Sequence, residues 1–217
     1  MKMIRWIGVV VASALLGCGG GGDGGTTQPP PPPPPPPPTT QTLGSISTSV
    51  TSMNLVAGNT QTITVTAFDT QGAVIASPGT PLFGVAQQAI ADVDAAGVVL
   101  GISAGTTQVT VSLARGGVTR TAAVAVTVTG ALPATASVST TSGDVFTPRT
   151  VAIARGGSVI WTFGATIHNV LFGATAGAPQ NIANTSGTTE SRTFLTAGNF
   201  SYDCSLHAGM TGQVIVR

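Results

Sequence analysis

Period-two alternation of β-branched residues with small or polar residues dominates the chain from residue 42 onward, and no amphipathic helical stretch of any length interrupts it. Turn pairs such as Gly116-Gly117 separate the alternating runs. Short runs with turn residues roughly every ten positions predict an antiparallel β-sandwich, and therefore an all-β protein. The clearest runs are Thr62–Phe68, Val109–Leu113 and Ala122–Val128.

The first residues predict export. Lys2 and Arg5 precede an apolar run, Trp6–Leu16, that is too short to span a bilayer, which takes about 20 residues. A basic head and a short apolar core are typical of a secretory signal peptide, here residues 1–17. The segment Leu15-Leu16-Gly17-Cys18 resembles a bacterial lipobox, which implies a lipoprotein whose first mature residue is a lipidated Cys18. The alternative is ordinary secretion with a free thiol at that position.

A Gly- and Pro-rich segment follows, and we expect it to form a disordered tether over residues 18–41. Pro29–Pro38 is an unbroken run of prolines. Such a run forms a stiff polyproline II rod of ~3.1 Å per residue, roughly 30 Å in all, which would hold the folded part off a membrane. A Pro-rich recognition segment is the alternative. Gly19 stands where an aspartate would favour inner-membrane retention, so we expect a lipid anchor in the outer membrane, on its periplasmic or surface side.

Residues 42–129 resemble the bacterial Ig-like domains of group 2, which occur in invasin- and intimin-type surface proteins. The matching segments are Leu55–Thr60, Phe68–Gly72, Ile90–Val99 and Gly101–Val111. Phe83 lies near the place of that family's usual core tryptophan. The resemblance implies an Ig-like β-sandwich that acts as a spacer or stalk, or in some members as an adhesive module. Residues 130–134 are the expected linker to a second domain at 135–217.

The second domain contains a scarce set of metal-binding side chains. The chain has two His and two Cys. Cys204, His207 and Met210 form a C-x-x-H-x-x-M pattern, and His168 lies 36 residues upstream of Cys204. Two imidazoles, a thiolate and a thioether are the ligand types of a blue-copper site. Taken singly, these residues could be a surface histidine, a buried thiol or a core methionine; zinc is the metallic alternative, although it seldom accepts a thioether.

Residues 138–217 also resemble a cupredoxin of the plastocyanin and amicyanin type, which implies a Greek-key β-sandwich or barrel. By that resemblance His168, Cys204 and His207 are the equatorial copper ligands and Met210 is the axial one. Asn169 and Ser205 match positions that join the two ligand segments by hydrogen bonds. Ile167 and Leu206 stand where the family often has proline. The matching segments are Val145–Pro148, Gly156–Trp161, His168–Val170, Thr193–Tyr202, Cys204–His207 and Met210–Val214.

These features predict a type 1 copper protein that acts as a one-electron carrier, tethered to the membrane of a bacterial cell envelope. We expect a monomer whose redox partner docks near His207. Envelope copper storage or delivery is one alternative, and a surface or adhesive module with a structural metal site is another. Two histidines cannot build the His-rich cluster of a multicopper oxidase, so we expect no enzyme. Eight basic and seven acidic residues form no basic stripe, which argues against nucleic-acid binding.

Overall fold

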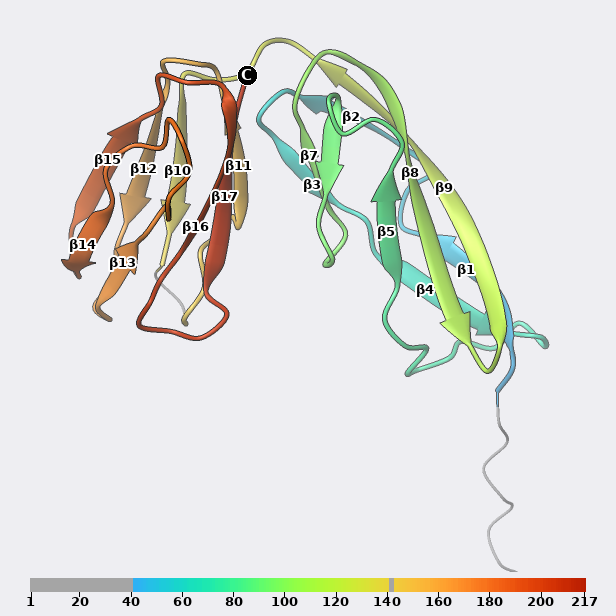
Figure 1. Ribbon diagram of the computed structural model, residues 1–217. Coiled ribbons are helices and arrows are strands. Elements are labelled where there is room, and N and C mark those ends of the chain that lie inside the picture. Colours follow the sequence, from blue (N-terminus) through green and yellow to red (C-terminus); the bar gives the residue numbers. More distant parts are fainter. Residues whose placement is uncertain (1–40, 141–142) are drawn as a thin grey trace, which may run out of the picture. The chain divides into compact units, whose positions relative to one another are not determined.

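A computed structural model describes residues 41–140 and 143–217. The regular secondary structure of these two ranges consists entirely of β-strands, as the alternation predicts (Figure 1). No helix suited to crossing a bilayer occurs in the described part of the chain. The expected signal peptide, Cys18 and the proline tether lie outside the described residues.

The first nine strands pair among themselves. They form a four-stranded sheet in the order β2-β9-β8-β5, a three-stranded sheet β3-β7-β6 and the pair β1-β4. Apolar side chains of these strands, most of them valines, form a common buried hydrophobic cluster. The strands are β1 (Leu43–Thr48), β2 (Ser52–Val56), β3 (Thr60–Thr62), β4 (Val65–Asp69), β5 (Leu82–Val85), β6 (Ala91–Val93), β7 (Val98–Gly101), β8 (Gly105–Arg115) and β9 (Val118–Thr129).

Two details of the first nine strands show what the local sequence determines about the backbone. Gly116 and Gly117 both have positive φ angles, 56° and 77°, which the tight turn between β8 and β9 requires. The run Thr62–Phe68 does not form one strand. It passes from β3 to β4 at Ile63 and Thr64, so its two halves pair in different sheets. Ile63 and Ala67 still point inward, so the alternation fixes the buried face but not the pairing partner.

The remaining eight strands form a β-sandwich. One sheet has the order β10-β12-β15, the other has the order β11-β17-β16, and β13 pairs with β14 beside them. Among these eight strands, the pairs β10-β12 and β11-β17 are parallel, and the other pairs are antiparallel. The strands are β10 (Thr135–Ser139), β11 (Thr150–Ile153), β12 (Ser158–Thr162), β13 (His168–Val170), β14 (Ile182–Thr185), β15 (Thr189–Thr193), β16 (Gly198–Asp203) and β17 (Thr211–Val216).

Aromatic side chains fill the space between these two sheets. Trp161 on β12 is fully buried and meets Tyr202 on β16 edge-on, with ring centroids 5.6 Å apart. Phe172 packs edge-on against both rings. Edge-to-face packing of large rings gives a close-packed, rigid interior. Cys204 and Met210 belong to the same buried cluster, so the candidate metal centre is built directly on this core.

Candidate metal centre

Cys204 reaches the core because of the alternation in β16. Phe200 and Tyr202 point inward from that strand. Cys204 directly follows Asp203, the last residue of the strand, and lies on the same face. All three side chains are at most 3 % exposed. The segment Cys204–Met210 then turns the chain from β16 into β17.

Backbone hydrogen bonds close this turn on itself. The N–H of Cys204 donates to the carbonyl of Met210 at 3.0 Å, and the N–H of Met210 donates to the carbonyl of His207 at 3.2 Å. The N–H of His207 donates in turn to the carbonyl of Cys204 at 3.3 Å. Gly209 has a φ of 79°, which a side chain would strain. The turn therefore holds three of the predicted ligand residues in one fixed segment.

His168 comes from another part of the sandwich, at the start of β13. Its side chain is fully buried, and its Nδ1 lies 3.9 Å from Sγ of Cys204. Nδ1 of His207 lies 3.5 Å from the same sulfur. Ligand atoms of the three residues all lie within 4.8 Å of one another. The structure thus brings together His168, Cys204 and His207, and it buries Met210 in the same hydrophobic cluster as Cys204.

These distances suit a single metal ion. Metal–sulfur and metal–nitrogen bonds of about 2.3 and 2.0 Å, arranged in a plane, separate the sulfur from each nitrogen by roughly 3.7 Å. The observed separations of 3.5 and 3.9 Å lie on either side of that value. One soft sulfur and two imidazole nitrogens also form a donor set that accepts both oxidation states of copper.

The protonation state of His168 favours metal binding. Its burial, and to a lesser extent the nearby His207, lower the pKa of His168 below the ordinary value of 6.5, although Asp144 opposes this. A lowered pKa keeps the imidazole neutral at neutral pH. Neutral imidazole is the form that binds metals.

The amide of Asn169 links the two segments that carry the predicted ligands. Its Oδ1 accepts the backbone N–H of Ser205, and its Nδ2 donates to Oγ of Ser205, both at 2.9 Å. Its backbone N–H points at Sγ of Cys204 from 3.5 Å. The backbones meet as well: Leu171 and Asp203 exchange two hydrogen bonds of 3.0 and 3.1 Å. The segments are therefore joined by side chains and by backbone.

Sequence reasoning missed two supports of this arrangement. Asn184 on β14 accepts a hydrogen bond from Nδ2 of Asn169 at 2.9 Å, so Asn169 is held from two sides. Asp144 places Oδ1 3.4 Å from Nε2 of His207. Neither residue stands in a motif, and no local pattern in the sequence indicates either contact.

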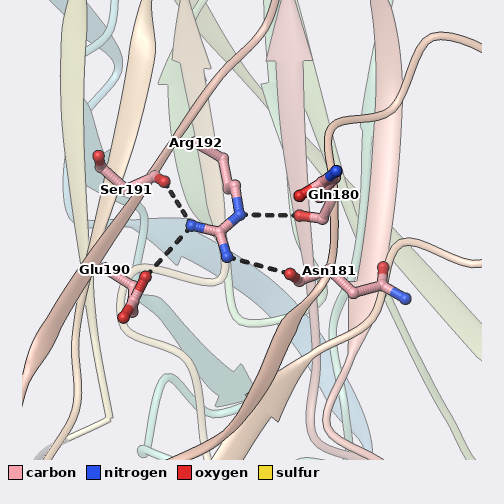
Figure 2. A network of polar contacts seen from close by, with 5 residues as sticks. All are labelled: Gln180, Asn181, Glu190, Ser191 and Arg192. Carbon is pink, nitrogen blue, oxygen red and sulfur yellow. Dashed lines mark hydrogen bonds and ion pairs between the residues drawn. The ribbon is translucent and has the colours of Figure 1, made fainter.

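An arginine fastens the segment that leads into β14. Figure 2 shows Arg192 donating to the carbonyls of Gln180 and Asn181, at 2.9 and 3.0 Å, and pairing with Glu190 at 3.2 Å. The side chain of Asn181 accepts the N–H of Phe172 at 2.9 Å. Because β14 pairs with β13, this network also fixes the strand that begins with His168.

Known proteins point to the same chemistry. Residues 134–217 match the family described as "Copper binding proteins, plastocyanin/azurin family". Among curated proteins, the chain is similar to the chloroplastic plastocyanin of Tetradesmus obliquus, at 39 % identity over 85 residues, which are 34 % of this chain. The match spans 59 % of the length of that plastocyanin.

Solved structures of amicyanin variants are also similar to part of the chain. A reduced Cu(I) form is 27 % identical, with a TM-score of 0.34, and covers 37 % of this chain and 80 % of that one. Another reduced variant is 25 % identical, with a TM-score of 0.35, and covers 39 % and 83 %. The family match thus makes residues 134–217 similar to copper-binding proteins of the plastocyanin/azurin type.

Proposed function

We propose that this protein is a one-electron carrier whose copper ion would be held by His168, Cys204, His207 and Met210. One observation carries the proposal: Nδ1 of both histidines faces the sulfur of Cys204 inside a fixed β framework. Copper in such a site supplies a reversible Cu(II)/Cu(I) couple. The contributions of the protein are the donor set, its rigidity and its access to solvent.

Rigidity favours electron transfer because the ligands need to move little between the two oxidation states. The turn Cys204–Met210 is closed by its own backbone bonds, and Asn169 fastens it to β13. The N–H of Asn169 that points at Sγ of Cys204 stabilises negative charge on the sulfur. A copper-delivery site would need ligands that dissociate readily from the metal. Because these contacts restrain the ligand residues, they favour an electron carrier.

Access is provided at His207. The His207 side chain is 20 % exposed, whereas His168 is fully buried, so His207 is the ligand through which electrons would enter or leave. Its neighbour Leu206 is 47 % exposed, and Ile167, next to His168, is 53 % exposed. Apolar side chains at such a point can exclude water from a short-lived contact. We infer that the redox partner docks on this surface and that the carrier acts as a monomer.

The rest of the chain fits an envelope protein. The signal-like residues 1–17 and the lipobox-like Cys18 favour an exported lipoprotein in the outer membrane, with residues 18–41 as its tether. The strands of residues 43–129 suit a bacterial Ig-like spacer that adds distance between the membrane and the copper domain. This part of the proposal is supported by sequence pattern.

The test is the visible spectrum of the purified protein after addition of Cu(II). We expect an intense thiolate-to-copper band that a reductant bleaches and an oxidant restores. Cys204→Ser abolishes the band, whereas Cys18→Ser, the matched control, retains it. A colourless wild-type protein would exclude the blue-copper site.

A second experiment distinguishes an electron carrier from a copper-delivery protein. The protein is cycled between its oxidised and reduced forms in the presence of a Cu(I) chelator. A carrier keeps its copper and its colour through repeated cycles. Loss of the metal to the chelator in the first cycle would instead indicate copper delivery.

A further inference from the structure

The imidazole of His207 has a different partner on each of its two nitrogens. Nδ1 faces Sγ of Cys204 at 3.5 Å, and Nε2 faces Oδ1 of Asp144 at 3.4 Å. A neutral imidazole that gives one nitrogen to a metal carries its proton on the other. An ionised carboxylate is only an acceptor, so it matches that proton.

The two histidines are held in different ways. His168 is fixed by burial, and its Nε2 has no hydrogen-bond partner among the described residues. The His207 side chain is partly exposed, and no carbonyl of the described residues accepts a hydrogen bond from its ring. Packing alone therefore restrains the ring of His207 less than that of His168. A partner for Nε2 selects the orientation in which Nδ1 faces the sulfur.

Asp144 is placed for this contact by a segment anchored in the core. Two residues later, Phe146 is 3 % exposed and packs edge-on against Tyr202, with centroids 4.8 Å apart. Thr147 exchanges two backbone hydrogen bonds with Ser139, of 2.8 and 2.9 Å. The backbone that carries Asp144 is thus tied to β10 and to the aromatic core, while its carboxylate stays 57 % exposed.

We propose that Asp144 is a positioning residue of the copper centre. Its carboxylate accepts the Nε2–H of His207 and orients the ring with Nδ1 toward Cys204. It also lowers the reduction potential, because a carboxylate makes the imidazole a stronger donor and its negative charge stabilises Cu(II) more than Cu(I). The inference rests on the proposed function, because it takes His207 to be a copper ligand.

The experiment compares four forms of the full chain: wild type, Asp144→Ala, Asp144→Asn and Asp203→Asn. Asp203 is the matched control, since it is an exposed carboxylate next to Cys204 whose side chain makes no hydrogen bond to either histidine in the described structure. Each form is loaded with copper and its blue band is recorded. Nuclear magnetic resonance of the diamagnetic Cu(I) form then measures solvent exchange of the His207 Nε2–H, and electrochemistry measures the potential.

In Asp144→Ala we expect this proton to exchange about tenfold faster or more, as the loss of a hydrogen bond to a charged group predicts, and the potential to rise. Asp144→Asn keeps an acceptor oxygen, so it retains the slow exchange while the potential still rises. Asp203→Asn leaves the exchange unchanged and moves the potential less than Asp144→Asn does.

Two results would overturn the inference while the blue band is intact. One is an Asp144→Ala protein with wild-type exchange and potential. The other is an equal rise of potential in Asp203→Asn and Asp144→Asn, which would mean that only the general charge matters. Failure of the proposed function is visible separately, as a wild-type protein without the blue band.

Discussion

Asn169 holds Ser205 with both atoms of its amide: Oδ1 accepts the N–H of Ser205, and Nδ2 donates to its hydroxyl, each at 2.9 Å. The two residues stand 36 positions apart in the chain. One side chain thereby connects the strand that begins with His168 to the turn that begins with Cys204. The stability of the domain and the geometry of the candidate metal centre consequently depend on the same contacts.

The first prediction concerns that amide. Asn169→Ala removes three side-chain hydrogen bonds and leaves the Ser205 N–H without its acceptor. At about 1 kcal/mol for each bond, we expect the free energy of unfolding to fall by about 2–4 kcal/mol. Urea denaturation of the metal-free protein measures it. Asn199→Ala, at an exposed position of β16, is the control and should cost no more than about 0.5 kcal/mol. Equal losses in the two variants would show that the contact adds no stability.

A second prediction concerns Arg192, whose guanidinium donates hydrogen bonds to the backbone carbonyls of Gln180 and Ser191 (Figure 2). A lysine has one compact charge and cannot replace the fork-shaped donor. Both Arg192→Lys and Arg192→Ala should therefore lower the free energy of unfolding, by about 1–3 kcal/mol for the alanine. Thermal denaturation compares them with Arg149→Ala, whose side chain makes no hydrogen bond to the described residues. If the lysine variant matches the wild type, the forked geometry is unimportant.

The third prediction is a pH dependence of the metal-free protein. The pKa of His168 is lowered from 6.5 by burial and by His207, so the unfolded chain takes up a proton at a higher pH than the folded one. The stability from the neutral, buried His168 is fully present above pH 6.5 and is lost progressively below it, at up to about 1.4 kcal/mol per pH unit. Urea denaturation from pH 8 to about pH 5 measures the slope. His168→Gln should flatten it, and an unchanged slope in that variant would assign the effect to another group.

The fourth prediction concerns the axial position. Met210→Leu conserves volume in the core, so we expect it to fold at a cost below about 1.5 kcal/mol. Because the leucine offers no sulfur to donate electrons to Cu(II), the reduction potential should rise while the blue band remains. Met53→Leu, at a buried methionine in the cluster formed by the first nine strands, is the matched control and should leave the potential unchanged. A rise in both variants would point away from Met210 as a ligand.

Much of this molecule follows from local patterns in its sequence. The alternation predicts an all-β protein, and in β16 it explains why Phe200, Tyr202 and Cys204 share one buried face. The glycines at 116 and 117 mark a hairpin because their positive φ angles belong to one kind of turn. The scarce histidines and the cysteine likewise direct attention to side chains that do lie together in the structure.

The parts that escape prediction depend on partners far apart in the chain. Ile63 and Thr64 interrupt a run that alternates perfectly, because the strand changes sheets there and period two carries no information on pairing. The roles of Asn184 and Asp144 arise from contacts across 15 and 63 residues, and neither residue type is distinctive by itself. Strand β14 is missed as well, since its polar, half-exposed sequence resembles a loop.

The backbone bridge between Leu171 and Asp203 has a consequence for how quickly the centre fills. Those two hydrogen bonds need no metal to form, so we expect the metal-free protein to keep the segments of His168 and Cys204 together. A copper ion would then bind to a preformed site, and its binding would require no folding of the chain. In stopped-flow mixing, the colour should develop at a rate proportional to copper concentration, with no plateau set by a slow rearrangement of the chain.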